Sequence, residues 1–290
     1  MRVARWRATL ARVIAEVNGI KLAYSDTRDG SPVVLLVHGF PLNRSMWDPQ
    51  LGSLRAEARV IAPDLRGFGA SEAGPPGPLT MRQHADDLAA LLDVVGVREP
   101  IVYCGLSMGG YIAFEFWRRH RGRVRALVLA DTRATVDTAE ARENRLRMAA
   151  RAEAVGGPQP AIDEMLPRMF SPTLRPGAPP EQLVRAMMAS SSVRAVADGQ
   201  RGLADRADSL DLLPSIDVPT LVIVGEHDQL TPPAESERML ELLPNARLTV
   251  LDQSGHMSNL ENPDAFNQAL LSFVSDVSQR PLPVSRDGGR

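Results

Sequence analysis

Hydrophobic positions along the chain fall into two alternating patterns. Continuous runs rich in β-branched residues and leucine occupy four short segments, residues 33–37, 59–62, 101–106 and 125–130. Such runs are typical of strands that are buried on both faces of a parallel sheet. Between two of them, in residues 81–95, apolar side chains recur at helical spacing and Gly96 follows as a helix C-cap. The alternation predicts an α/β fold, with a mostly parallel twisted sheet flanked by helices.

The same scheme covers both ends of the core. Strand-like runs at residues 12–17 and 21–26 flank Asn18-Gly19, a dipeptide that favours a tight hairpin. After a long interruption the pattern resumes with two strands, at residues 219–225 and 246–251, and two helices, at residues 234–243 and 263–278.

The interruption contains no convincing strand. It predicts four helices separated by loops rich in proline and glycine, at residues 138–155, 161–169, 180–189 and 193–203. A segment of this length is too long for one crossover connection, so we interpret it as an inserted helical cap. The predicted organisation is an N-terminal extension (residues 1–12), a core in two parts (13–132 and 214–279), a helical cap (133–213) and a flexible tail (280–290).

A Gly-Leu-Ser-Met-Gly-Gly motif at residues 105–110 lies between a predicted strand and a helical run at residues 111–120. Gly-x-Ser-x-Gly in this context is a nucleophile elbow, a tight turn that exposes the serine hydroxyl above the sheet. Ser107 is therefore the candidate nucleophile. A serine hydroxyl is a poor nucleophile at neutral pH, so the motif implies a base and an orienting acid elsewhere in the chain.

Both partners are available late in the chain. His256 follows the last predicted strand and is the candidate base, because loops at the carboxyl ends of strands assemble the sites of such sheets. Asp228 follows the penultimate strand and is the preferred acid. Asp131, just past another strand, and Glu226 remain alternatives.

Two backbone N–H groups are candidates for binding the oxyanion. One belongs to Met108, directly after the nucleophile, and the other to Phe40 in the His-Gly-Phe-Pro segment at residues 38–41. We interpret His38 as an anchor for that loop, and Asp64 and Arg66 as scaffolding of another loop.

Composition narrows the functional classes. Apolar residues make up 44% of 290 residues and charged residues 23%, with a net charge of −2, so nothing favours a nucleic-acid or membrane partner. The single cysteine, Cys104, excludes an internal disulfide and a cysteine-based zinc site. We expect no metal and no cofactor, a cytoplasmic location, and a small-molecule substrate; the aliphatic content is compatible with a homodimer.

Taken in order, the landmarks resemble those of the α/β-hydrolase superfamily. They include His-Gly-Phe-Pro at residues 38–41, Asp-Leu-Arg-Gly-Phe-Gly-Ala-Ser at 64–71, Gly-Leu-Ser-Met-Gly-Gly at 105–110, Val-Gly-Glu-His-Asp at 224–228 and Gly-His-Met at 255–257. Within it the chain looks most similar to capped esterases and 3-oxoadipate enol-lactonase-like proteins. The resemblance implies a triad of Ser107, Asp228 and His256, an oxyanion hole at Phe40 and Met108, and cofactor-free hydrolysis of an ester or lactone. Haloalkane dehalogenases and epoxide hydrolases carry aspartate where this chain has serine.

The substrate pocket is less well determined. Candidates for its lining are Trp47 and four residues of the cap, Met165, Met169, Phe170 and Met187. Their apolar character favours an uncharged acyl group, whereas Arg133 or Arg168 would suit a substrate carboxylate. Alternative functions are C–C bond hydrolysis or perhydrolysis on the same triad, and a small-molecule receptor.

Overall fold

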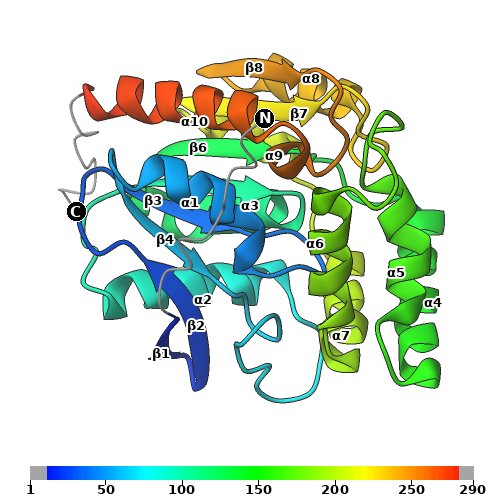
Figure 1. The fold of residues 1–290 in the computed structure, drawn as a ribbon. Coiled ribbons are helices and arrows are strands. Elements are labelled where there is room, and N and C mark those ends of the chain that lie inside the picture. The colour runs from blue at the N-terminus through cyan, green and yellow to red at the C-terminus, as the bar shows by residue number, and fades with distance from the viewer. Residues whose placement is uncertain (1–11, 281–290) are drawn as a thin grey trace.

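The computed structural model describes residues 12–280, which form an eight-stranded sheet in the order β1-β2-β4-β3-β5-β6-β7-β8 (Figure 1). Strands β1 and β2 form an antiparallel hairpin and β2 is antiparallel to β4, whereas every neighbouring pair from β4 to β8 is parallel. The strands are β1 (Val13–Val17), β2 (Ile20–Asp26), β3 (Val33–Val37), β4 (Arg59–Pro63), β5 (Ile101–Leu106), β6 (Val124–Ala130), β7 (Thr220–Gly225) and β8 (Ala246–Leu251). The predicted α/β architecture is confirmed.

Helices cover both faces of this sheet. Helices α1 and α10 pack against each other on one face, and α2 and α3 pack together on the other (Figure 1). The helices are α1 (Asp48–Leu54), α2 (Met81–Val94), α3 (Met108–His120), α4 (Ala139–Val155), α5 (Gln159–Met165), α6 (Pro179–Ala189), α7 (Val193–Ala204), α8 (Pro233–Leu242), α9 (Ser258–Glu261) and α10 (Pro263–Ser278). Short 3-10 turns occupy Arg44–Trp47, Arg121–Arg123, Leu166–Arg168 and Leu210–Ser215.

The central strands are buried along their whole length. Every residue of β3, β5 and β7 is buried, as their uninterrupted apolar sequences predict for strands covered on both faces. Cys104 of β5 lies in this core, and burial raises the pKa of its thiol. The edge strand β8 is only partly buried. The rigid centre of the sheet therefore carries the loops that follow β3, β5 and β7.

The strand order locates the site. The chain moves from β3 outward to β4 and then returns to place β5 on the other side of β3. The connections after β3 and β5 consequently diverge at the carboxyl edge of the sheet, which opens a crevice at this switch point. Phe40 follows β3 and Ser107 follows β5, so this topology brings the two segments together.

Helices α4 to α7 connect β6 to β7 and stand beside the carboxyl edge of the sheet (Figure 1). They correspond to the segment predicted to form a helical cap. Helix α4 packs against α5 and α7. Helix α5 begins and ends earlier than the predicted 161–169. Pro160 lies in its first turn, where a missing N–H costs nothing, and Pro167 falls in the 3-10 turn that follows.

The expected N-terminal extension and C-terminal tail lie outside the described residues, apart from Arg12 and Arg280. In residues 12–280 no helix combines the length and apolar character needed to cross a bilayer.

Candidate active site

Ser107 occupies a strained turn between β5 and α3. Its φ of 54° and ψ of −112° are unusual for a residue with a side chain. The turn is held on both sides: the Ser107 N–H donates to the Ala130 carbonyl at 2.9 Å, and the Thr132 hydroxyl donates to the Ser107 carbonyl at 2.8 Å. The strain is thus supported by the neighbouring strand β6 and the loop after it.

The elbow requires its glycines for space. A Cβ atom on Gly105 would lie 2.3 Å from the Gly109 carbonyl oxygen, and one on Gly109 would lie 2.3 Å from the Val37 carbonyl oxygen. Both obstacles are backbone atoms that no side-chain rotation can remove. Helix α3 starts at Met108, three residues before the predicted start. Its first turn contains two glycines, which disfavour a helix in general but are needed here for space.

His256 is paired with Asp228 in a buried contact. The Nδ1 atom of His256 lies 2.8 Å from Oδ2 of Asp228. The Thr231 hydroxyl donates to the same oxygen at 2.7 Å, and the N–H groups of Leu230 and Thr231 donate to Oδ1. Burial alone would raise the pKa of Asp228, but the neighbouring imidazole and these hydrogen bonds lower it below its usual value. The carboxylate is therefore ionised and orients the imidazole.

The two alternative acids have other partners. Asp131 is fully buried after β6, where Oδ1 accepts from the Gly225 N–H at 2.9 Å and Oδ2 accepts from the Ser258 hydroxyl at 2.5 Å. Burial and the nearby Asp228 charge raise the pKa of Asp131 well above its ordinary value. Glu226 is half exposed and accepts from the Gln253 N–H. Of the three candidates, Asp228 is the one that contacts His256.

The two proposed oxyanion donors border the same cavity as Ser107. Met108 is the first residue of α3, where N–H groups have no acceptor within the helix. No group among residues 12–280 accepts a hydrogen bond from the Phe40 N–H. Both N–H groups are thus available to a ligand.

His38 supports this loop rather than the chemistry. Its Nδ1 atom lies 2.8 Å from the Gly39 carbonyl oxygen, and its Nε2 atom accepts from the Leu65 N–H at 2.9 Å. Asp64 accepts from the N–H groups of Arg44 and Ala70. Arg66 forms a buried ion pair with Asp87. None of these charged groups lines the cavity.

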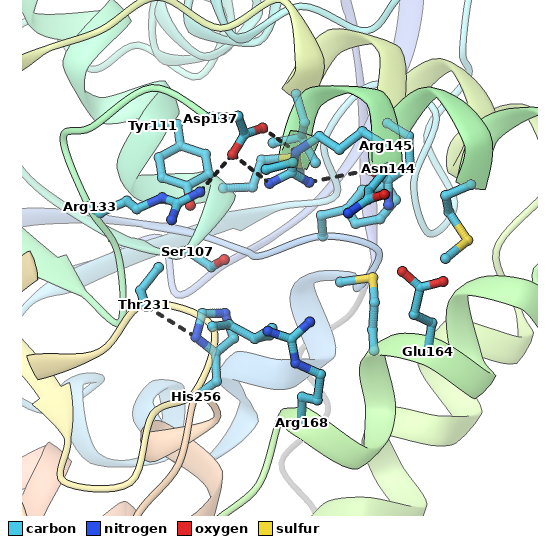
Figure 2. Close-up of a pocket in the computed structure, with 18 residues that line it drawn as sticks. Ser107, Tyr111, Arg133, Asp137, Asn144, Arg145, Glu164, Arg168, Thr231 and His256 are labelled. Atoms are coloured by element: carbon cyan, nitrogen blue, oxygen red, sulfur yellow. Dashed lines mark hydrogen bonds and ion pairs between the residues drawn. The ribbon is translucent and has the colours of Figure 1, made fainter. Parts of the chain in front are cut away.

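A cavity of about 260 Å³ connects the elbow to the helices beyond β6. Ser107 and His256 both point into it, with Thr231 beside the imidazole (Figure 2). Helix α4 contributes four residues at helical spacing to its wall, Ala141, Asn144, Arg145 and Met148. Five charged side chains also reach it: Arg133, Asp137, Arg145, Glu164 and Arg168. The wall is therefore much more polar than the sequence suggested.

Most of the apolar side chains suggested for the substrate pocket lie elsewhere. Met165 does line the cavity, whereas Trp47, Met169, Phe170 and Met187 do not. Trp47 has no exposed surface and packs 6.1 Å from the ring of Phe266. Met169 and Met187 are buried in packing contacts, and Phe170 lines a separate surface groove. The expected apolar lining is corrected on this point, because these side chains hold the helices together.

Sequence reasoning missed Tyr111 and the α4 residues of the wall. Ala141, Asn144, Arg145 and Met148 recur at intervals of three and four, which is a signal for one helix face. That face mixes polar and apolar residues, so hydrophobic patterning alone does not single it out. Within residues 12–280, no group of three or more His, Cys, Asp or Glu side chains has an arrangement that would hold a metal ion.

Comparison with known proteins agrees with this geometry. The sequence profile described as alpha/beta hydrolase family matches residues 34–269. The chain belongs to this hydrolase family. The predicted fold and the resemblance to esterases and enol-lactonases are confirmed.

Three relatives of this hydrolase are informative. A thermophilic esterase from Thermogutta terrifontis, whose structure contains malate, is 43% identical with a TM-score of 0.88, covering 93% of this chain and 100% of that chain. The 3-oxoadipate enol-lactonase 2 of Acinetobacter baylyi is 31% identical over 84% of this chain and 88% of its own length. A non-heme haloperoxidase of Rhodococcus erythropolis is 33% identical over 89% of this chain and 97% of its own length.

Proposed function

We propose that this hydrolase cleaves carboxylic esters or lactones without a cofactor, through an acyl-enzyme on Ser107. The observation that carries the proposal is a strained serine that shares one cavity with His256, whose imidazole is paired with the buried Asp228. The esterase and enol-lactonase named above support the same reaction class. The substrate is a small molecule, as the size of the cavity indicates.

The first half of the reaction transfers the acyl group to serine. Because Nδ1 of His256 is engaged by Asp228, its Nε2 atom is the one that takes the proton from the Ser107 hydroxyl. The serine oxygen attacks the carbonyl carbon, and the N–H groups of Phe40 and Met108 bind the oxyanion. His256 then gives its proton to the leaving alkoxide as the C–O bond breaks. A lactone opens at this step, so its alcohol stays attached to the acyl group.

The second half releases the acid. His256 removes a proton from water, which attacks the acyl carbon and forms a second oxyanion in the same position. Collapse of this intermediate returns the proton to Ser107 and frees the carboxylate. No step requires a metal or an organic cofactor.

Turnover of p-nitrophenyl esters from acetate to decanoate, together with a panel of lactones, tests the proposal. We expect Ser107→Ala to lose at least about 10⁴-fold in kcat/KM, since removing one triad member leaves only binding and oxyanion contributions. Ser275→Ala, exposed on α10, is the matched control and keeps full activity. Wild-type turnover by Ser107→Ala, or no turnover of any ester or lactone by folded wild-type protein, contradicts the proposal.

Perhydrolysis is a second candidate, favoured by the haloperoxidase relative. Hydrogen peroxide would replace water as the attacking group on the acyl-enzyme and release a peroxy acid. Peroxide-dependent bromination of monochlorodimedone in acetate buffer, lost in Ser107→Ala, would identify it. Ester hydrolysis without any such bromination excludes it.

A further inference from the structure

One buried carboxylate gathers three guanidinium groups at the wall of the cavity. The Asp137 side chain is only 1% exposed. It accepts from Arg133 Nη2 at 2.6 Å, from Arg145 Nε at 2.5 Å and from Arg206 Nη2 at 2.8 Å. Burial alone would raise the pKa of Asp137, but Arg206 and Arg145 hold it well below its usual range. The cluster is therefore fully ionised and has two positive charges in excess.

The remaining charged residues of the cavity do not cancel this excess. Among the described residues of the wall, Glu164 is the only other acidic side chain, and it is paired at 3.0 Å with Arg151, which lies outside the cavity. Arg168 adds a further positive charge, and its one hydrogen bond within residues 12–280 is a long contact of 3.5 Å to the Gln229 carbonyl. The cavity consequently favours a negatively charged ligand.

The three arginines of the cluster are not equivalent. Arg206 is 3% exposed, also donates to the carbonyls of Leu203 and Thr135, and lies 4.5 Å from the ring centre of Tyr111. Its donors are used within the protein, so its role is structural. Arg133 and Arg145 are 22% and 21% exposed and line the cavity. Arg145 donates from Nη1 to the Gln200 amide oxygen at 3.2 Å as well as to Asp137, so it contributes charge rather than free donors.

Arg133 retains unused donors. Its Nη2 atom binds Asp137, but its Nε atom is buried without a hydrogen-bond partner among the described residues. No described residue accepts a hydrogen bond from its Nη1 atom, which is therefore the donor left for a ligand in the cavity. The guanidinium fork is suited to the two oxygens of a carboxylate.

The cluster is also close to the reacting serine. Thr132, the residue before Arg133, donates its hydroxyl to the carbonyl of Ser107. Figure 2 shows the Ser107 hydroxyl between His256 on one side and the Arg133–Asp137 cluster on the other. A substrate whose ester carbonyl lies at Ser107 thus extends its other end along the arginines.

We infer that this cavity selects esters or lactones that carry a second, ionised carboxylate, and that Arg133, positioned by Asp137 beside the charge of Arg145, binds that carboxylate. The inference rests on the proposed ester or lactone hydrolysis at Ser107 and specifies the substrate class. Asp137 acts as a positioning residue: it carries the same charge as the ligand but holds two cations at a spacing they would not keep alone.

The test compares substrates that differ only in the distal charge. Monomethyl succinate, glutarate and adipate are paired with methyl butanoate, pentanoate and hexanoate, and acid release is followed in a pH-stat at pH 7.5. We expect kcat/KM to favour the charged member of at least one pair by about 10- to 100-fold, mainly through KM, the size expected for a hydrogen bond to a charged group. Free glutarate or adipate should inhibit p-nitrophenyl acetate hydrolysis competitively.

Variants separate positioning from simple charge. Arg133→Gln should reduce the charged-to-neutral preference at least about tenfold. Asp137→Asn adds a positive charge to the cluster, so a purely electrostatic effect would strengthen the preference, whereas we expect it to weaken. Arg147→Gln is the matched control on α4: it removes an exposed arginine paired with Glu143, away from the cavity, and should leave the preference unchanged. Arg133→Lys, which keeps the charge but not the fork, should recover part of it.

The outcomes distinguish this inference from the proposed function. Hydrolysis of neutral esters that depends on Ser107, with no preference for charged substrates, overturns the inference and leaves the proposed function intact. A stronger preference in Asp137→Asn overturns the positioning role of Asp137. If Asp137→Asn does not fold, Arg145→Gln decides, because loss of the preference there supports the cluster and an unchanged preference overturns it. The absence of all ester and lactone hydrolysis contradicts the proposed function itself.

Discussion

Two buried carboxylates, Asp131 and Asp228, follow neighbouring strands at the carboxyl edge of the sheet, and their hydrogen bonds assign them different roles. Asp228 is ionised and contacts the imidazole of His256. Asp131 joins the end of β7 to Ser258, two residues beyond His256. Burial raises its pKa, and its two oxygens accept from the Gly225 N–H and the Ser258 hydroxyl.

Asparagine substitution separates these roles. We expect Asp228→Asn to lower kcat on a neutral ester by about 10³- to 10⁴-fold, because the amide does not stabilise the imidazolium or hold the correct tautomer. Asp131→Asn should keep activity within about fivefold, since an amide of the same shape can still accept from the Gly225 N–H and hydrogen-bond the Ser258 hydroxyl. Steady-state kinetics, with circular dichroism as the folding check, measures both. Equal losses in the two variants, or a larger loss in Asp131→Asn, would reassign the acid.

At the level of single residues, the sequence indicated the candidate catalytic residues better than it indicated the residues that line the pocket. Ser107 is detectable because a tight elbow demands glycines at fixed offsets, and His256 because it follows the last strand. Whether the side chains of Trp47 and Met187 face the cavity or the interior depends on how helices distant in sequence pack. The local sequence does not determine it. The role of Asp137 depends on arginines from 4 to 69 residues away.

At the scale of elements, the strand–elbow–helix unit combines a buried strand with close backbone approaches at Gly105 and Gly109. Strand β5 is paired on both sides, so the turn after it cannot relax outward. The strained conformation of Ser107 is maintained by this rigid frame. The same rigidity makes the glycines of the motif irreplaceable.

Alanine substitution measures this constraint. We expect Gly109→Ala to destabilise the protein by several kcal/mol or to prevent folding, because its Cβ would collide with the Val37 carbonyl. Gly52→Ala, in the exposed middle of α1 with nothing within 4 Å of the new Cβ, should instead stabilise by about 0.5–1 kcal/mol. Thermal unfolding followed by circular dichroism compares them. A Tm of Gly109→Ala equal to that of wild type would refute this account of the elbow.

Element prediction succeeded where periodicity was strong and failed at proline and glycine. The buried strands β3, β5 and β7 were recognisable from their uninterrupted apolar sequences. The start of α3 was missed because Gly109 and Gly110 argue against a helix, while their purpose here is close packing. The polar inner face of α4 was missed because it serves the cavity and not the core.

For the whole molecule, a histidine buried in the core links stability to pH. His84 of α2 is fully buried near Phe68, and neither ring nitrogen has a hydrogen-bond partner among residues 12–280. Burial lowers its pKa from 6.5 to about 3, with smaller contributions from His38 and Arg66. Between these two pH values the unfolded chain binds a proton that the folded protein excludes, so the free energy of unfolding decreases as the pH falls.

Replacing this histidine should flatten the pH dependence. His84→Leu removes a titrating group and two unpaired nitrogens at nearly constant volume. Urea unfolding between pH 7 and pH 4 should show a smaller loss of stability for the variant than for wild type, by on the order of a few kcal/mol. Parallel curves for the two proteins over this range would show that His84 is not responsible.

Covalent trapping tests whether Ser107 is the nucleophile. The protein is incubated with diethyl p-nitrophenyl phosphate, and the adduct is located by intact-mass and peptide mass spectrometry while ester hydrolysis is followed in parallel. We expect one diethylphosphoryl group per chain on Ser107, formed as activity is lost, and none on Ser107→Ala. Loss of activity with the adduct on another residue, or ester hydrolysis that persists after Ser107 is fully modified, would contradict the account.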